Sequence, residues 1–388
     1  MSPVLPGATI GFLGGGQLAR MSAMAARAMG YGVAVLDPDP GCAAAPLADL
    51  VIAAALDDAA AAARLAARSA VVTFDIERVD PAAARAAAAH APVRPSPAVL
   101  ELLQDRARQK LWLQEVGFPV GPWLPVADAA SARAAVVALG PCRLKRRRDG
   151  YDGRGQAPAP TPALAAEAHA ALGGAPCVAE AELALEAELS VLVARSAGGA
   201  LAVHPAARNW HEDGVLVQSV LPAPLPEPIL AEARQLALGV AAELALEGVL
   251  AVELFLDRRH GLLVNELAPR PHNTFHAAGA ACGVGQFEQH VRAICGLPLG
   301  DPTPHATAAL LNLLGEDAAV AHEALAVPGV TLHLYGKAPR PRRKVGHLCA
   351  AAPTAEEALE RIARARAILG SARRRGGSGT PARSDLRV

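Results

Sequence analysis

The stretch "GVLAVELFLDRRHGLLVNELAP", residues 248–269, decides how the largest part of this 388-residue chain folds. Two apolar runs flank the polar turn "RRHG", which is the pattern of an antiparallel β-hairpin. If Asp257 faces Leu262 across this turn, counting back along both strands places Glu253 opposite Glu266. Cross-strand partners have Cβ atoms roughly 4.5–5.5 Å apart, so two carboxylates among valine, leucine and phenylalanine side chains would repel each other.

Three arrangements relieve this repulsion, and the hairpin alone leaves all three open. We favour a divalent cation between the acids, because Mg²⁺ binds one or two carboxylates together with substrate phosphates, and Asn265 would add a neutral oxygen. A proton shared by the two acids is the second arrangement. In the third, one strand slips by one residue and one acid faces the opposite side of the sheet. We therefore predict Glu253 and Glu266 as the metal ligands.

A second informative stretch is "KRRRDGYDGRGQ" at residues 145–156, in which four consecutive basic side chains lead into a segment with three glycines and a closing amide. The preceding "PCRLK" indicates a short strand that delivers Lys145. Backbone N–H groups of a glycine-rich loop hold phosphate oxygens. A nucleic-acid patch and an exposed hairpin turn are the alternatives. We favour a lid over nucleotide phosphates, since such a loop and a carboxylate pair for Mg²⁺ together form a coherent ATP site.

Composition restricts the choice further. Charged residues make up 19% of the chain and aromatic residues 3%, and Lys+Arg and Asp+Glu both number 37, so we expect no broad nucleic-acid-binding surface. We expect no membrane span, because no run of about 18 strongly apolar residues occurs, and no secretory signal, because the N-terminus lacks a basic region. The six cysteines contain no CxxC pair, and we expect reduced packing thiols in a cytoplasmic protein.

The N-terminal part indicates a small open α/β domain. An apolar strand at 8–13 is followed by a glycine turn, a helix and a second strand at 31–40, and another strand at 70–77 follows the Ala-rich helix 58–69. The Gly14–Gly16 turn at a helix N-terminus suits a phosphate or carboxylate. Its spacing is not GxGxxG, which disfavours an NAD-dependent oxidoreductase.

Apolar periodicity predicts further helices over 98–116, 229–247, 285–296 and 354–369, and strands over 306–315 and 330–336. The first of these helices carries Asp105, Arg106 and Lys110. The tail, residues 371–388, is polar and glycine-containing, and we expect it to be disordered.

Seven stretches occurring in order identify a family resemblance: "GFLGGGQLARM", "LDPDPGCAA", "QDRARQK", "GYDGRGQ", "VLAVELF", "VNELAPRPHN" and "GQFEQHVRAICGLPLG". From about residue 8 to about 350 the chain resembles the 5-(carboxyamino)imidazole ribonucleotide synthetases, ATP-grasp carboxylate-amine ligases of purine biosynthesis. The resemblance implies an ATP-dependent carboxylation of 5-aminoimidazole ribonucleotide by bicarbonate. Carboxyphosphate would be the intermediate, and ADP and phosphate the by-products.

The resemblance also implies an architecture and a set of ligands. The expected parts are an N-terminal open α/β (pre-ATP-grasp) domain, an ATP-grasp domain with a small lid, a small C-terminal domain and the tail, at residues 1–100, 101–300 (lid roughly 122–184), 301–370 and 371–388. The expected cofactors are ATP and Mg²⁺, without biotin. The expected partners are the two small-molecule substrates and a second copy of the chain in a homodimer, with no nucleic acid and no membrane.

For the nucleotide, the resemblance implies contacts to ATP from both sides of the lid. The phosphates would contact Arg106 and Lys145, and the ribose would contact Glu188. The remaining expected ATP contacts are Gly150, Tyr151, Asp152, Gly153, Arg154, Gly155, Gln156, Glu180, Ala181, Glu182, Leu183, His211, Asn265 and Glu266.

For the imidazole ribonucleotide, the resemblance implies a site against the N-terminal domain. The expected catalytic residues are Arg270, His272 and Lys145. The expected substrate contacts are Gln17, Leu18, Glu77, Asn273, Lys337, Arg343 and Lys344.

Several positions depart from the family pattern. The residues concerned are Asp75, Arg78, Asp149 and Phe275, none of which is an expected metal ligand. Two other ATP-grasp enzymes, the formate-using glycinamide ribonucleotide transformylase and biotin carboxylase, are rival assignments. A degenerate ATP-binding module with a regulatory role is a further alternative.

Overall fold

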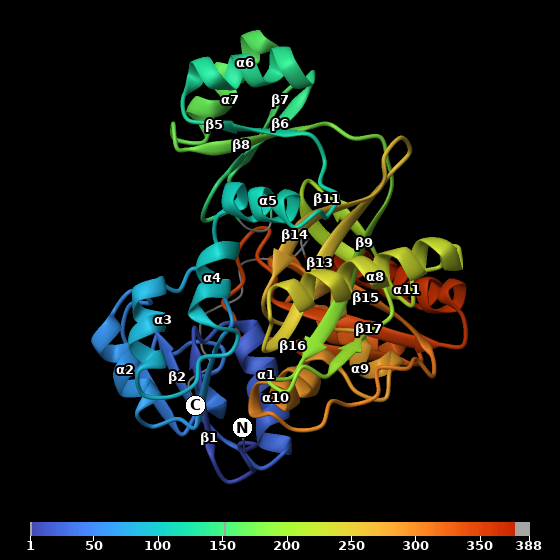
Figure 1. The fold of residues 1–388 in the computed structure, drawn as a ribbon. Coiled ribbons are helices and arrows are strands. Elements are labelled where there is room, and N and C mark those ends of the chain that lie inside the picture. Colours follow the sequence, from blue (N-terminus) through green and yellow to red (C-terminus); the bar gives the residue numbers. More distant parts are fainter. Residues whose placement is uncertain (1, 151–152, 377–388) are drawn as a thin grey trace.

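The computed structural model describes residues 2–150 and 153–376. Three sheets organise this part of the chain: a parallel one near the N-terminus, an antiparallel one in a separate upper layer, and a large central one (Figure 1). The predicted combination of an open α/β domain, a lid and a larger ATP-grasp sheet is confirmed.

The N-terminal sheet has the strand order β3-β2-β1-β4 with all strands parallel. Its strands are β1 (Thr9–Leu13), β2 (Gly32–Asp37), β3 (Leu50–Ala53) and β4 (Val71–Phe74), and its helices are α1 (Gln17–Ala28), α2 (Ala59–Ala66) and α3 (Pro81–Ala88). The inner strands β1 and β2 and the edge strand β4 are largely buried, as parallel strands covered by helices are. The edge strand β3 was not predicted, since it is short, only partly buried and beside an alanine-rich segment.

The predicted single helix 98–116 is wrong. Two helices occupy this region, α4 (Pro97–Leu103) and α5 (Arg106–Glu115). Asp105 lies between them in an extended conformation, and its Oδ1 accepts hydrogen bonds from the N–H groups of Ala107 and Arg108 at 3.0 and 3.3 Å. An aspartate that caps a helix in this way starts a new helix instead of continuing the old one.

The lid is a four-stranded antiparallel sheet with the order β5-β8-β6-β7. Its elements are β5 (Trp123–Val126), α6 (Ala129–Leu139), β6 (Cys142–Arg146), β7 (Gln156–Ala159), α7 (Pro162–Ala171) and β8 (Cys177–Ala181). Helices α6 and α7 cover the outer face of this sheet (Figure 1). Lys145 pairs with Gln156 across β6 and β7, so these two residues close the base of the glycine-rich loop.

The central sheet has the order β14-β13-β9-β11-β12-β15-β17-β16, with β10 beside β9. Its strands are β9 (Leu185–Arg195), β10 (Leu201–Val203), β11 (Ala207–Glu212), β12 (Val215–Leu221), β13 (Gly248–Asp257), β14 (Gly261–Ala268), β15 (Thr307–Leu313), β16 (Val330–Leu334) and β17 (Gly346–Ala352). The C-terminal strands therefore do not form a sheet of their own, because β15 pairs with β12.

The hairpin of β13 and β14 differs from the prediction at its turn and agrees with it at the two acids. Asp257 pairs with Gly261 instead of Leu262, so the turn is one residue shorter than predicted. A β-bulge between Glu253 and Leu254 then shifts the register, and Glu253 faces Glu266 as predicted. One extra residue on one strand is what a bulge provides, and the bulge restores the predicted pairing of the two acids.

Helices complete the packing around the central sheet. They are α8 (Glu227–Glu243), α9 (Ala278–Ala281), α10 (Gln286–Cys295) and α11 (Ala355–Gly376). The predicted start of a disordered tail at residue 371 is wrong, since 371–376 continue α11. Ala372 is buried there, and Arg373 lies 3.3 Å from Asp317. The rest of the predicted tail, 377–388, lies outside the described residues.

Helix α10 joins the N-terminal domain to the central sheet. Val291 and Ile294 pack in one apolar cluster with Ile10 and Phe12 of β1, and α10 also contacts β13. Removing buried methyl groups from this junction therefore weakens the packing of α10 between the N-terminal domain and the central sheet.

We predict that Ile294→Ala lowers the free energy of unfolding by about 2–4 kcal/mol, because Ile294 is fully buried and the substitution leaves a cavity. Urea denaturation followed by circular dichroism measures this. The control is Leu325→Ala, since Leu325 is half exposed and the expected change is within about 0.5 kcal/mol. A loss below about 1 kcal/mol for Ile294→Ala would contradict the junction described above.

Candidate active site

A cavity of about 230 Å³ lies between the lid and the central hairpin. The lid contributes Lys145 of β6 and the segment that leaves β8, whereas β13 and β14 contribute Phe255, Val264 and Asn265. The predicted residues Glu180, Ala181, Glu182 and Leu183 all line it. An apolar floor beside backbone and carboxylate groups suits a flat polar ring such as a purine.

Glu180 holds two lysines at one end of this cavity. Its carboxylate lies 2.6 Å from Lys145 Nζ and 3.2 Å from Lys110 Nζ. Burial raises the pKa of Glu180, but the charges of Lys145, Lys110 and Arg106 outweigh burial and lower it to about 2. Lys145 also lies 3.4 Å from Asn265 Oδ1, so it reaches from the lid to the hairpin. We did not predict Lys110 as a site residue, although it is the last residue of the motif "QDRARQK".

The two facing carboxylates of the hairpin each contact a basic side chain. Glu253 Oε1 lies 3.1 Å from His272 Nε2, and Glu253 Oε2 accepts a hydrogen bond from Asn265 Nδ2 at 3.3 Å. Glu266 accepts a hydrogen bond from Arg106 at 2.9 Å. Burial raises the pKa of Glu253, but His272, the more distant His211 and Arg106 outweigh it and hold this pKa well below its usual range. An ionised Glu253 disfavours the shared-proton arrangement.

The donor set at the hairpin fits Mg²⁺. Glu253, Glu266 and Asn265 offer hard oxygen atoms, and both glutamates remain partly exposed. In residues 2–150 and 153–376, no group of three or more His, Cys, Asp or Glu side chains is arranged to hold a metal by itself. An ion that binds one or two carboxylates and takes its other ligands from phosphates and water needs no such group.

Glu188 and His211 face each other on neighbouring strands of the central sheet. Their side chains lie 2.7 Å apart, Oε2 to Nδ1. Burial lowers the pKa of His211, but Glu188 and the more distant Glu253 outweigh burial and raise it. The structure thus brings these two predicted residues together on the sheet that carries Glu253.

The glycine-rich loop follows the conformation that its glycines allow. Gly153 and Gly155 have φ of 74° each, in the left-handed region that favours glycine. A Cβ added to Gly153 would lie 2.8 Å from the carbonyl oxygen of Asp213 in the β11–β12 turn, so the loop packs directly on that turn. Gly150 and Gln156 flank the loop and Arg154 is exposed on it, whereas the predicted contacts Tyr151 and Asp152 lie outside the described residues.

The base of the loop is fixed to α5 by Asp105. Besides capping the helix, this carboxylate accepts two hydrogen bonds from Arg147, at 2.9 and 2.7 Å. The N–H of Arg106 donates to the carbonyl of Arg147 at 2.9 Å. Arg106 is thereby placed between the loop and Glu266. This role of Asp105 was not predicted, since no local pattern links it to Arg147, 42 residues away.

The predicted substrate residues come together below the hairpin from distant parts of the chain. Arg270 Nε lies 2.8 Å from Glu77 Oε1. Gln17 donates to Asn273 Oδ1 at 3.2 Å and accepts from Lys337. Segments from the N-terminal domain, the loop after β14 and the loop after β16 therefore meet at one place.

Three other predicted residues are less directly placed. Leu18 is buried in the second position of α1. Lys344 is buried, and its charge acts on both His211 and His276. Arg343 is partly buried and donates to Ala338 O within its own loop at 3.1 Å, so its contact with substrate stays a prediction.

The departures from the family pattern have local explanations. Arg78 and Asp149 face each other at 3.8 Å, both exposed, and Asp149 adopts the left-handed conformation (φ 63°) that glycine adopts most readily. Phe275 is fully buried in an apolar cluster of the central sheet. Burial raises the pKa of Asp75 to about 6, against a hydrogen bond from the N–H of Ala19 and the charge of Arg270, which lower it.

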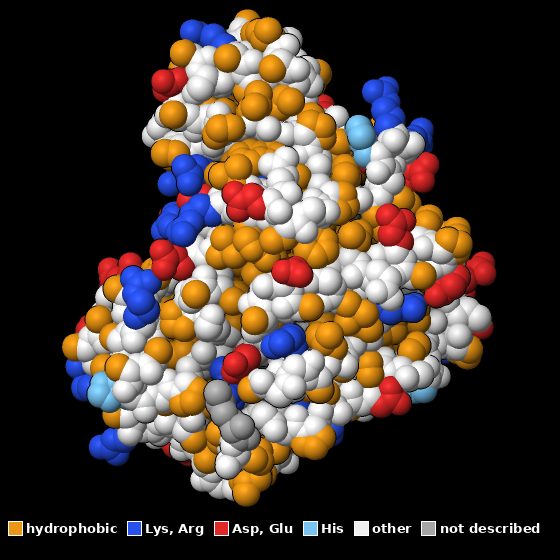
Figure 2. Space-filling view, viewed as in Figure 1, with side chains coloured by type: hydrophobic (Ala, Val, Ile, Leu, Met, Phe, Trp, Pro, Cys, Tyr) orange, Lys and Arg blue, Asp and Glu red, His pale blue; other side chains and the backbone are white. Residues whose placement is uncertain are grey.

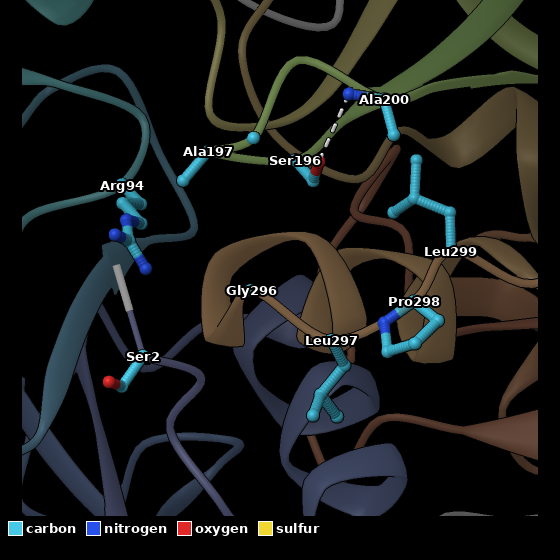
Figure 3. A pocket seen from close by; sticks show the side chains of 10 residues that line it. Ser2, Arg94, Ser196, Ala197, Ala200, Gly296, Leu297, Pro298 and Leu299 are labelled. Carbon is cyan, nitrogen blue, oxygen red and sulfur yellow. Dashed lines mark hydrogen bonds between the residues drawn. The ribbon is translucent and has the colours of Figure 1, made fainter.

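A second cavity, of about 270 Å³, lies away from these residues (Figure 3). The β9–β10 turn, the end of α10 and Arg94 line it. Arg94 is buried and lies 2.5 Å from Glu247, and it donates to Ile294 O at 2.7 Å, so its charge is already compensated. None of the predicted site residues lines this cavity.

The surface carries charges of both signs. On the face drawn in Figure 2, basic and acidic side chains are interspersed. Among the described helices, none combines the length and the apolarity that crossing a bilayer requires.

Three family models match the chain in consecutive regions. The ribonucleotide synthetase preATP-grasp domain matches residues 7–104, the ATP-grasp domain residues 111–287, and the phosphoribosylaminoimidazole carboxylase C-terminal domain residues 308–361. The order agrees with the predicted order of domains.

Individual proteins and structures agree with these matches over nearly the whole chain. The chain is 44% identical over 347 residues to the N5-carboxyaminoimidazole ribonucleotide synthase of Brucella melitensis, covering 88% of this chain and 96% of that relative. It resembles the ADP complex of an N5-carboxyaminoimidazole ribonucleotide synthetase, with a TM-score of 0.91, 38% identity and coverage of 96% and 100%. It also resembles an Aspergillus clavatus synthase solved with ADP and 5-aminoimidazole ribonucleotide, with a TM-score of 0.88, 29% identity and coverage of 94% and 99%.

We predict that Glu180→Gln lowers the free energy of unfolding by about 3 kcal/mol at pH 7, because the buried Lys110 and the partly buried Lys145 lose their counter-ion. A carboxyl pKa depressed by folding stabilises the protein above the unfolded value of about 4.5, and this contribution disappears as the pH falls towards 2. Urea denaturation at pH 7 and pH 3 should therefore show a smaller difference between wild type and variant at pH 3.

The matched control for this prediction is Glu182→Gln, since the Glu182 side chain is half exposed. Its expected effect is within about 0.5 kcal/mol at both pH values. An effect of Glu180→Gln that does not shrink with falling pH would contradict the assignment of an ionised, lysine-bound Glu180.

Proposed function

The chain belongs to the N5-carboxyaminoimidazole ribonucleotide synthase family of ATP-grasp ligases, and we propose that it carboxylates the amine of 5-aminoimidazole ribonucleotide with ATP and bicarbonate. The observation that carries this proposal is the continuity of the two halves of the site. Glu266 ends the nucleotide side, and Arg270, His272 and Asn273 follow within the same short segment on the substrate side. A phosphorylated intermediate formed at one half has a direct route to an amine bound at the other.

The proposed reaction has two steps. An oxygen of bicarbonate attacks the γ-phosphorus of ATP, the bond from that phosphorus to the bridging oxygen breaks, and carboxyphosphate and ADP form. The amine then takes up the carboxyl carbon, phosphate leaves and the amine loses a proton. Whether the amine attacks carboxyphosphate itself or CO₂ released from it, the protein has to hold the two reactants close together.

The cations of the nucleotide side are proposed to receive the phosphates. Lys145 and Arg106 are now paired with Glu180 and Glu266, at 2.6 and 2.9 Å. A bound triphosphate would offer both cations negative oxygens, and the glycine loop between β6 and β7 would cover it. Preorganised positive charge of this kind stabilises phosphoryl transfer.

We propose that Glu253 and Glu266, with Asn265 beside them, hold Mg²⁺. When bound, the ion neutralises charge on the β- and γ-phosphates. Arg106 and His272 contact the two carboxylates at 2.9 and 3.1 Å, so the same acids are held in place for the ion.

On the substrate side, Arg270 and His272 are proposed to position the reacting carboxyl group. Arg270 is held by Glu77 of the N-terminal domain at 2.8 Å, and the Nδ1 atom of His272 lies 2.9 Å from Thr274 Oγ1. These contacts fix both side chains before substrate binds. A lid that closes over them excludes water, which would otherwise hydrolyse carboxyphosphate.

Two further expectations stay proposals. All six cysteines are free and buried, which supports a reducing compartment such as the cytoplasm. The proposed homodimer is tested by light scattering coupled to size-exclusion chromatography, which should give twice the mass of the 39.6 kDa chain.

Phosphate release measured with each reactant omitted in turn tests the proposed function. We expect activity that requires ATP, Mg²⁺, bicarbonate and 5-aminoimidazole ribonucleotide together, and that avidin does not inhibit. Replacement of bicarbonate and the imidazole ribonucleotide by formate and glycinamide ribonucleotide should give no activity. Avidin-sensitive activity, or activity with formate, would instead favour one of the rival ATP-grasp reactions.

We predict that Glu266→Gln lowers turnover roughly 100-fold or more, because one of the two proposed metal-binding carboxylates is lost. Phosphate release measured at a series of Mg²⁺ concentrations gives the loss of turnover, and a thermal melt checks that the fold persists. The control is Glu186→Gln on β9, an exposed acid for which turnover within twofold of wild type is expected. Near-normal turnover of Glu266→Gln at ordinary Mg²⁺ would contradict the metal assignment.

A further inference from the structure

We propose that His276 is a positioning residue that fixes the orientation of the Asn273 amide, so that Asn273 presents a hydrogen-bond donor to the imidazole ribonucleotide. This inference rests on the proposed function, because it concerns the substrate that Asn273 faces. His276 has no place among the residues that the motifs predicted. We infer the role of His276 from a chain of hydrogen bonds. The groups at both ends of this chain determine which atom donates and which accepts in each bond.

The first end is anchored on the backbone of His272. The N–H of His272 donates to Gln286 Oε1 at 2.8 Å, and Gln286 Nε2 donates to the carbonyl oxygen of His272 at 2.9 Å. A backbone N–H only donates and a carbonyl only accepts, so the amide of Gln286 has one orientation. Its remaining contact runs from Nε2 to the Nδ1 atom of His276 at 3.2 Å.

This contact determines the tautomer of His276. Because Gln286 Nε2 is a donor, His276 Nδ1 has to be an acceptor without a proton. The neutral ring therefore carries its proton on Nε2, which lies 3.1 Å from Asn273 Oδ1. His276 thus donates to the oxygen of the Asn273 amide.

The second end is anchored on an ammonium group. Lys337 Nζ, which only donates, contacts Gln17 Oε1. The other half of that amide, Gln17 Nε2, must then be the donor to Asn273 Oδ1 at 3.2 Å. Two chains that start from unrelated groups therefore assign Oδ1 of Asn273 as an acceptor.

The amide of Asn273 therefore keeps one hydrogen-bond donor, its Nδ2 group, for a ligand. With Oδ1 taken by His276 and Gln17, the Nδ2 group of Asn273 points elsewhere, and within the described part of the chain no group accepts a hydrogen bond from it. Asn273 is only partly buried, at the place where the predicted substrate residues meet. A hydroxyl oxygen or ring nitrogen of the imidazole ribonucleotide would supply the acceptor.

Stacked rings hold His276 in this orientation. Its imidazole lies parallel to that of His347, with centroids 4.4 Å apart, and Phe287 stacks on it at 5.5 Å. His347 in turn stacks with His333 at 4.8 Å and bonds to the Tyr335 hydroxyl at 2.7 Å. Burial first, and then the nearby histidines and Lys344, lower the pKa of His276, which keeps the ring neutral.

Two substitutions separate this role from simple packing. In His276→Gln the side-chain amide reaches the position of Nε2 and retains a donor toward Asn273, whereas in His276→Asn the amide ends near Nδ1 and loses it. Calorimetric titration with 5-aminoimidazole ribonucleotide in the presence of ADP measures the affinity without requiring turnover. We expect His276→Gln to bind within about threefold of wild type and His276→Asn about tenfold more weakly, with ADP affinity unchanged in both.

A double-mutant cycle tests the route through Asn273. If His276 acts through Asn273, adding His276→Asn to Asn273→Ala weakens binding no further. Equal losses for His276→Gln and His276→Asn, or additive losses in the cycle, would overturn the inference. His333→Phe, at the outer end of the stack, is the control and should leave the affinity within twofold. Wild-type protein that does not bind the ribonucleotide would contradict the proposed function itself.

Discussion

Two carboxylates held face to face on neighbouring strands are the constraint on which the rest of the site depends. Glu253 and Glu266 are paired in the central hairpin, where two facing carboxylates repel each other unless other groups offset their charge. Arg106 lies 2.9 Å from Glu266, and His272 lies 3.1 Å from Glu253. Arg106 comes from a helix whose start is fixed by Asp105, and His272 comes from the loop that leads to the substrate residues. The pair thereby ties the nucleotide side to the substrate side.

Acidic side chains contact basic ones throughout the site. Glu180 contacts Lys110 and Lys145, Glu266 contacts Arg106, and Glu253 contacts His272. A triphosphate with its metal ion would bring both signs of charge into this arrangement, taking contacts from the cations and from the acids together. The lid loop, whose base is fixed to α5 through Asp105 and Arg147, would close over a site whose charges are already in position.

Features that show in apolar periodicity or in motifs were predicted from the sequence, whereas features that depend on long-range contacts were missed. The hairpin placed Glu253 opposite Glu266, although its turn was counted one residue too long, because a bulge does not show in an apolar pattern. The break of the helix at Asp105 was missed because apolar periodicity continues across it. Lys110 and His276 were missed because a single polar residue in a buried position acquires its role from partners up to 70 residues away. The roles of individual residues toward ATP and substrate stay predictions.

A crystal structure with a non-hydrolysable ATP analogue and Mn²⁺ in place of Mg²⁺ tests the central claim most directly, since Mn²⁺ is located by its anomalous scattering. The account predicts an anomalous peak within coordination distance of both Glu253 and Glu266, with the analogue's phosphates beneath the glycine loop and its base beside Glu180–Leu183. A peak that touches neither carboxylate, or the analogue bound in the cavity beside Arg94, would contradict it.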